Sequence, residues 1–213
     1  MNDKKEKLDE TVIVKPNNKN KRTLLLILVV SIAPLALAYF SFFTGIGVPD
    51  NTASFGNIIN PALQVESLLA ENQQTAYDDM QRDKKWHLFI PVSEQCDASC
   101  EQILYLTRQV HIRLGDKGAR IDRTAINFGG ANGEAYLSSI QSEHPRLKVL
   151  TVDKHVWNNW LDQSPSLSAM RDKPFYLLVD QEGFAMMTYS LDVDGGNLLK
   201  DLKRALRHSI DYQ

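Results

Sequence analysis

This chain of 213 residues has only two cysteines, little net charge, and no internal repeat or low-complexity block. Its formal net charge is −2 and its pI is near 6.2, so the sequence gives no indication of a nucleic-acid partner. Two cysteines allow at most one disulfide within the chain. Hydrophobic residues make up 43% and charged residues 23%, as in a typical globular chain, and the length leaves room for one domain plus a further segment.

Charge is absent from one long run, Thr23–Phe43, in which no Lys, Arg, Asp or Glu occurs. About 20 apolar residues suffice to cross a bilayer, so we predict a transmembrane anchor here. Only Asp50 follows the run closely, whereas basic residues gather just before it: Lys15, Lys19, Lys21 and Arg22. The positive-inside rule then predicts that residues 1–22 are cytoplasmic and that the rest of the chain lies across the membrane.

The apolar run has two alternative interpretations. Ala36-Leu37-Ala38 resembles the cleavage site of a signal peptide, but the run continues past it to Phe43. A buried core helix would carry a polar face, which this run lacks. An exported domain that can form one disulfide indicates a bacterial inner-membrane protein with a periplasmic domain. A mitochondrial inner-membrane origin is the alternative, against which the acidic start of the chain argues.

The sequence predicts four segments: a disordered cytoplasmic tail over 1–22, the anchor over 23–43, a linker with a short helix over 44–83, and a folded domain over 84–213. Gly, Asn, Ser and Thr are frequent in residues 44–60 and favour a linker there. Asn60 followed by Pro61 is typical of a helix start, so we place the short helix at Pro61–Ala70.

From Trp86 onward the predicted strands and helices alternate, which favours an α/β fold with a mainly parallel central sheet and a final hairpin. The predicted strands are Trp86–Pro91, Arg120–Phe128, Leu147–Val152, Phe175–Val179 and Phe184–Tyr189. The predicted helices are Ala98–Leu114, Glu134–Glu143, one that Asp153 caps, and Asn197–Ser209. Trp157 and Trp160 share a face of the third helix at i, i+3 spacing, where we expect them to pack in the core.

Both cysteines, Cys96 and Cys100, lie where the first predicted strand passes into a helix. A helix start offers unpaired N–H groups and a partial positive charge, which favour a thiolate. If both residues are helical, positions i and i+4 share a face, so both sulfurs can meet one disulfide or one metal ion.

Three roles for this pair stay open. In thiol–disulfide exchange Cys96 would attack and Cys100 would resolve the mixed disulfide. Two soft thiolates also suit Cu(I). The third role is a static disulfide, which we favour least because so short a loop would stabilise the fold little.

The order of elements over about Lys84–Ser209 resembles the thioredoxin superfamily. The features that carry the resemblance are the Cys pair at a strand-to-helix junction, further βα units, and Lys173–Gly183 (KPFYLLVDQEG) before a hairpin and a last helix. The resemblance implies a thioredoxin-like fold in which Pro174 is a cis-proline packed against the Cys pair. An ordinary trans proline at a strand start is the alternative.

The spacing C-x-x-x-C behind a membrane anchor is similar to the Sco/SenC family, which helps to assemble cytochrome c oxidase by handling copper for its binuclear centre. The resemblance implies that Cys96, Cys100 and a distal His bind copper. Asp172 stands at the position of that His, and Asn127–Gly130 replaces the family's acidic Asp-Pro-x-x-Asp segment. His155 is the nearest alternative third ligand. We interpret the remaining histidines as structural or solvated: His87, His111, His144 and His208.

The resemblance therefore implies an accessory factor for cytochrome c oxidase assembly with Cys96, Cys100 and Pro174 as its site residues, copper as its metal and the copper-site subunit of the oxidase as its partner. A general thiol–disulfide oxidoreductase of the envelope is one alternative. A scaffold that keeps the fold and only docks partners is another. The sequence leaves open whether the chain is an enzyme or a metallochaperone.

Overall fold

The computed structural model describes residues 18–44, 54–69 and 74–209, and the chain separates into two compact units, Met1–Thr52 and Ala53–Gln213. Residues 1–17 of the tail predicted over 1–22, and residues 45–53 of the predicted linker, lie outside the described residues, whereas residues 18–22 of that tail are helical.

The first unit contains one helix, α1 (Asn18–Thr44), among the residues described. Its segment Lys21–Thr44 is long and apolar enough to cross a membrane, with a mean hydropathy of 2.4, and it includes the anchor predicted at Thr23–Phe43. Two hydroxyl groups in the helix donate to carbonyl oxygens four residues earlier, Ser31 to Ile27 and Thr44 to Phe40. These bonds satisfy polar groups that hydrocarbon could not satisfy.

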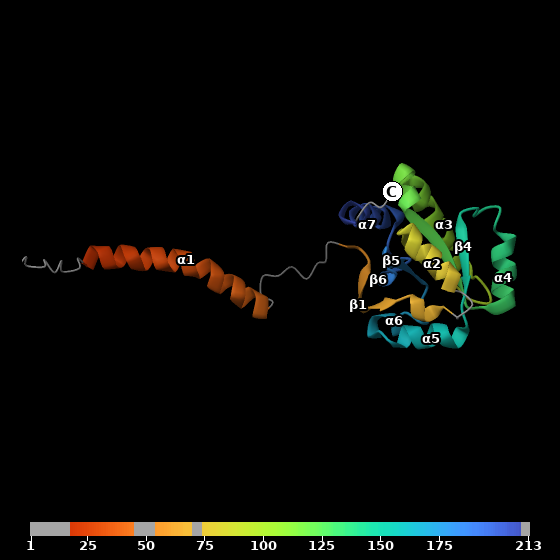
Figure 1. Cartoon of the computed structure of the whole chain (residues 1–213), viewed down its shortest axis with the longest axis horizontal. Helices are drawn as coiled ribbons and strands as arrows, with labels where there is room; N and C mark the ends of the chain where they lie inside the picture. The colour runs from red at the N-terminus through yellow and green to blue at the C-terminus, as the bar shows by residue number, and fades with distance from the viewer. Residues whose placement is uncertain (1–17, 45–53, 70–73, 210–213) are drawn as a thin grey trace, which may run out of the picture. The chain divides into compact units, whose positions relative to one another are not determined.

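The second unit is built on a six-stranded mixed sheet with the strand order β1-β6-β5-β2-β3-β4 (Figure 1). The strands are β1 (Asn57–Gln64), β2 (Trp86–Val92), β3 (Ile121–Asn127), β4 (Leu147–Thr151), β5 (Phe175–Val179) and β6 (Phe184–Ser190). Strands β2, β3 and β4 are parallel, while β5, β6 and β1 add antiparallel pairs on the other side of β2. The α/β class and the final hairpin were thus predicted correctly, but the sheet is mixed and not mainly parallel, since three of its five strand pairs are antiparallel.

Helices connect and cover these strands. They are α2 (Gln74–Asp83), α3 (Ala98–Arg113), α4 (Gly130–Ser139), α5 (Lys154–Asp162), α6 (Pro165–Ser168) and α7 (Gly195–His208), with 3-10 turns η1 (Glu66–Leu68) and η3 (Gly115–Arg120). Asp153 caps α5 as predicted, because its carboxylate accepts the backbone N–H groups of His155 and Val156. Helix α4 begins four residues before the predicted Glu134, since the turn Gly129–Gly130 already starts it.

The predicted helix Pro61–Ala70 is wrong: residues 57–64 form the edge strand β1, and only the turn η1 follows it. Strand β1 pairs antiparallel with β6 and buries Ile59 and Leu63 against the core. A proline is tolerated here because an edge strand need not donate every N–H group to a neighbour. The Asn60-Pro61 helix signal was therefore overridden by pairing with a strand more than 120 residues away, and part of the predicted linker belongs to the folded domain.

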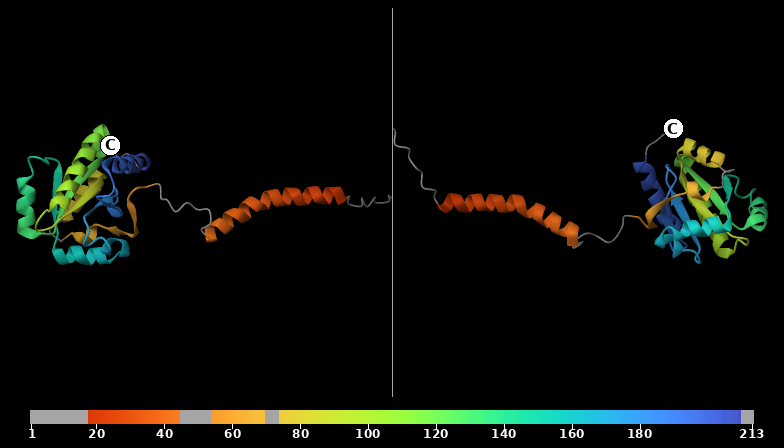
Figure 2. Two further views of the ribbon diagram at one scale, coloured as in Figure 1. Left: turned by 180° about the vertical axis from the view of Figure 1, so that it is seen from behind. Right: turned by 60° about the horizontal axis from the view of Figure 1, so that its bottom comes forward.

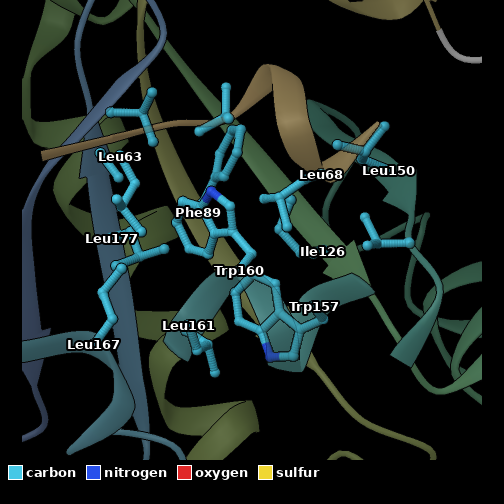
Figure 3. Close-up of a cluster of buried hydrophobic side chains, with 14 of the residues drawn as sticks. Leu63, Leu68, Phe89, Ile126, Leu150, Trp157, Trp160, Leu161, Leu167 and Leu177 are labelled. Carbon is cyan, nitrogen blue, oxygen red and sulfur yellow. The ribbon is translucent and has the colours of Figure 1, made fainter. Parts of the chain in front are cut away.

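Two apolar clusters, one on each face of the sheet, hold the domain together. The first joins Phe89 and Leu177 of the sheet to Trp157 and Trp160 of α5 (Figure 3). Trp160 is 1% exposed and its indole N–H donates to the Gln64 carbonyl oxygen at 2.9 Å, so it also fixes the end of β1. The expected core packing of both tryptophans is confirmed.

The second cluster covers the other face with α3 and α7, which lie across the sheet from α5 and α6 (Figures 1 and 2). Leu88 and Ile90 alternate with Phe89 along β2, so this strand feeds both clusters. Burial of β2 on both faces explains its continuous apolar sequence.

His87 is the polar exception in β2. It is 1% exposed, its ring lies edge-on to Phe89, and its Nδ1 has no hydrogen-bond partner among the described residues. Burial lowers the pKa of His87 to about 4, although the Asp122 carboxylate opposes this shift. The interpretation of His87 as structural agrees with this position.

We predict that the free energy of unfolding decreases as the pH falls from about 6.5 to about 4, by up to about 3 kcal/mol from His87 alone. In this range the unfolded chain binds a proton at His87 that the folded chain does not, so acid favours unfolding. Denaturant titrations at several pH values should show that the free energy of unfolding falls less steeply with decreasing pH in His87→Leu than in wild type. His155→Gln, which removes an exposed histidine, is the control, and equal slopes for the two variants would contradict the prediction.

Candidate functional site

Cys96 and Cys100 form a disulfide, with their Cα atoms 5.2 Å apart. Cys96 precedes α3 and Cys100 lies in its first turn, so the pair spans the helix start instead of sharing a helical face. Both residues are half-buried and pack against the apolar cluster beneath α3. The two sulfurs therefore meet in a disulfide, one of the two arrangements that the spacing allowed, although Cys96 lies before the helix and not within it.

Asp97, between the two cysteines, is the N-cap of α3. Its carboxylate accepts the backbone N–H of Cys100 at 2.9 Å, and its carbonyl oxygen accepts the N–H of Glu101 at 2.9 Å. These bonds satisfy donors that a helix start leaves free and fix the turn that carries Cys100. They also place an acidic side chain within the disulfide loop.

A cleft of about 280 Å³ opens beside the pair and is lined by Cys100. Because β5 runs antiparallel to β2, the start of β5 lies next to the end of β2, and both reach this cleft. Phe128 and Trp157 form an apolar wall with their rings stacked 5.5 Å apart. The segment Arg171–Phe175 also lines the cleft, with the Phe175 ring stacked 6.4 Å from the ring of Trp157, and Arg171 pairs with Asp162.

Pro174 lines this cleft together with Cys100, as the resemblance implied. Its predicted cis peptide bond is wrong, because Asn60–Pro61 is the cis bond among the described residues. A turn in which the Lys173 N–H donates to the Met170 carbonyl oxygen leads into β5 with a trans bond at Pro174. Trans is the favoured isomer of an X–Pro bond by about 0.5–1 kcal/mol, and the motif alone does not specify the isomer.

The predicted third copper ligand, His155, is not brought together with the cysteines. It lies exposed in the first turn of α5 and does not line the cleft, whereas Asp172 does. Among the described residues, no three His, Cys, Asp or Glu side chains are arranged to hold a metal ion. The two sulfurs remain the soft donors that the site itself provides.

Asn127 and Gly129 support the site, and the sequence analysis did not identify this role. The Asn127 side chain accepts the Gly129 N–H and donates to the Gly130 carbonyl oxygen, which fixes the turn after β3. A Cβ atom on Gly129 would collide with the backbone of Ser93 and Glu94, the loop that leads to Cys96. The pair Gly129-Gly130 directly after a predicted strand was the available signal.

A family model described as transmembrane-like, thioredoxin-like, C-terminal domain matches residues 86–209. The matched range contains the cysteines and all strands except β1. The match confirms the predicted thioredoxin-like fold. No curated protein matches the chain.

Solved structures similar to the chain include members of the Sco family. Copper-bound yeast Sco1 is 15% identical over 76% of this chain and 99% of its own, with a TM-score of 0.49. Copper-bound ScoI of Arabidopsis thaliana is 13% identical over 61% and 89% (TM-score 0.45). A SCO1/SenC family lipoprotein from Bacillus anthracis is 14% identical over 60% and 84% (TM-score 0.46).

We predict that Gly129→Ala displaces the loop before Cys96 and lowers the free energy of unfolding by about 1–3 kcal/mol, because the added methyl group meets backbone atoms that have no space to move. Denaturant unfolding measures the stability. The rate at which dithiothreitol reduces the disulfide shows whether the loop before Cys96 is displaced. Gly130→Asn is the matched control, since Gly130 has open space around its Cα and asparagine tolerates its φ of 59°. Equal effects of the two substitutions would refute the role of Gly129.

Proposed function

We propose that this chain, which belongs to the family of transmembrane-like, thioredoxin-like C-terminal domains, is a membrane-anchored thiol–disulfide protein that acts through Cys96 and Cys100. The observation that carries the proposal is the disulfide at the start of α3 beside an open cleft. The short loop between the cysteines gives little stabilisation of the fold, so a chemical role explains the pair better than a structural one.

In the proposed reaction the reduced pair reduces a disulfide of a client protein. One thiolate attacks a client sulfur and forms a mixed disulfide, while the other client sulfur leaves as a thiolate. The second cysteine then attacks its partner's sulfur, closes the Cys96–Cys100 bond and releases the client as a dithiol. Two electrons pass to the client. In this protein the reacting groups are the two cysteines at the start of α3. We retain Cys96 as the attacking sulfur and Cys100 as the resolving one.

The client we propose is the copper-site subunit of cytochrome c oxidase, whose cysteines must be reduced before copper enters. This assignment rests on the C-x-x-x-C spacing behind a membrane anchor, through which the sequence resembles the Sco/SenC family. It includes a bacterial inner-membrane location with the N-terminus in the cytoplasm and the thioredoxin-like domain in the periplasm. In this role the chain is a thiol–disulfide oxidoreductase with a narrow client range.

Delivery of Cu(I) is a second candidate for the same site. The two sulfurs meet in the disulfide, so the reduced side chains can approach one ion, and two thiolates suit Cu(I) without a further ligand. Copper would then be cargo that passes to the client. Both candidates use the same residues. In the first the reduced protein passes two electrons to the client, and in the second it passes Cu(I).

We predict that the full-length Cys100→Ser variant accumulates mixed disulfides in cells, because Cys96 can attack but nothing resolves the product. Non-reducing electrophoresis and mass spectrometry would identify the trapped proteins, with Cys96→Ser and the double variant as controls. Trapping of the copper-site subunit supports the proposed client, and a broad set of trapped proteins indicates a general oxidoreductase. Full oxidase assembly with the double variant would instead point to a scaffold.

The cargo candidate predicts that the reduced full-length protein in detergent binds one Cu(I) tightly enough to compete with a strong chelator, and that Cys96→Ser loses this binding. The measurement is an anaerobic titration monitored through the chelator's absorbance. His155→Gln should bind as wild type does, because His155 lies outside the cleft. Copper that stays with the chelator would rule out the cargo role and leave the reductase role in place.

A further inference from the structure

A second hollow lies at the end of α3 that is remote from the cysteines, and arginine and histidine side chains dominate its lining. It has a volume of about 350 Å³. The side chains that give it this character are Arg108, His111, Arg123, His144 and Arg146, and we call this site the arginine pocket. The rest of its lining is Ile112, Pro145 and two glycines, so none of the described residues that line it is acidic.

Arg123 is the innermost of these side chains and is only 2% exposed. It lies in β3, and its guanidinium reaches the underside of α3. Its Nε donates to the Thr107 hydroxyl at 3.2 Å, and its Nη2 donates to the Leu104 carbonyl oxygen at 2.8 Å. The Thr107 oxygen and the Leu104 carbonyl hold the plane of the guanidinium in one orientation.

The positive charge of Arg123 has no carboxylate partner among the described residues. Its Nη2 also lies 3.4 Å from His144 Nδ1, but its Nη1 forms no hydrogen bond with any described group. A buried guanidinium normally requires a paired anion, because transfer of a charge out of water is costly. The uncompensated charge is thus a feature that a bound anion would explain.

The side chains around Arg123 add positive charge and donors. Arg108 and Arg146 form no ion pair with any described residue, and burial, with a further contribution from Arg108, lowers the pKa of Arg123 to about 10. His144, 8% exposed, accepts from Arg123 through Nδ1 when its proton is on Nε2. Burial, Arg123 and Arg108 all lower the pKa of His144, whereas Glu143 raises it. In its neutral form His144 can therefore offer an N–H donor without adding charge.

We propose that the arginine pocket binds the phosphate group of a small ligand through Arg123, Arg108 and Arg146. Three guanidinium groups match a phosphate, which carries about 1.5–2 negative charges at neutral pH, better than they match a single carboxylate. Arginine forks also fit phosphate oxygens geometrically. The volume exceeds that of one phosphate ion, so a phosphate ester fits as well as inorganic phosphate.

The test is a calorimetric titration of the full-length protein in detergent with inorganic phosphate at constant ionic strength. We expect saturable binding that weakens at least about tenfold in Arg108→Gln and in Arg146→Gln, since each removes a charge-assisted contact. Arg113→Gln is the matched control, because Arg113 is an exposed arginine of the same helix that does not line the pocket. Arg146 is exposed and Arg108 is half-buried, and neither takes part in the hydrogen bonds of Arg123 to Thr107 and Leu104.

A second arm separates the two sources of a phosphate group. The protein is reconstituted in nanodiscs of phosphatidylcholine with or without phosphatidylglycerol, and competition between the headgroup and inorganic phosphate is measured. Loss of phosphate affinity in phosphatidylglycerol discs identifies a lipid headgroup as the ligand, and unchanged affinity identifies a soluble phosphate. Absence of saturable phosphate binding in detergent, or an equal loss in Arg113→Gln, would overturn the proposal.

Discussion

The pairing of β2 with an antiparallel neighbour is the constraint on which the rest of the domain depends. Strand β2 runs parallel to β3 on one side and antiparallel to β5 on the other. If β5 ran parallel to β2, its first residue would lie at the opposite end of the strands, beside the start of β2. The observed pairing brings Pro174 to the end of β2, beside the cleft that Cys100 in the first turn of α3 also lines. Because its side chains alternate between the two faces, β2 contributes to both apolar clusters at once.

Much of this arrangement could be predicted from local sequence. Strands with continuous apolar runs, such as Phe175–Val179, and helices with a clear cap, such as the one after Asp153, have the predicted positions. The position of the Cys pair at a strand-to-helix junction also followed, because the apolar run ends and helical spacing begins around it. Pattern and capping therefore located the candidate site before its geometry was known.

What the sequence did not indicate depends on contacts between distant residues. Residues 57–64 carry a helix-start signal but form β1, because β6 offers an edge that only the folded domain presents. Gly129 is required by the backbone of Ser93 and Glu94, which is near it only after β2 and β3 have paired. The isomer at Pro174 and the distance of His155 from the cysteines are likewise set by the tertiary structure.

Helix α3 links two sites of opposite electrostatic character. Its N-terminus presents partial positive charge to the cysteines, and its last turn presents partial negative charge at the end that borders the arginine pocket, while the Leu104 carbonyl within the helix accepts a hydrogen bond from the Arg123 guanidinium. A helix end supplies only about half an elementary charge, whereas three arginines border the pocket there. The helix therefore stabilises part of the cationic cluster in the empty protein, and the remaining positive charge is what a phosphate group would neutralise. Because the helix stabilises part of this positive charge, the pocket can exist without its ligand, and binding there is expected to be reversible.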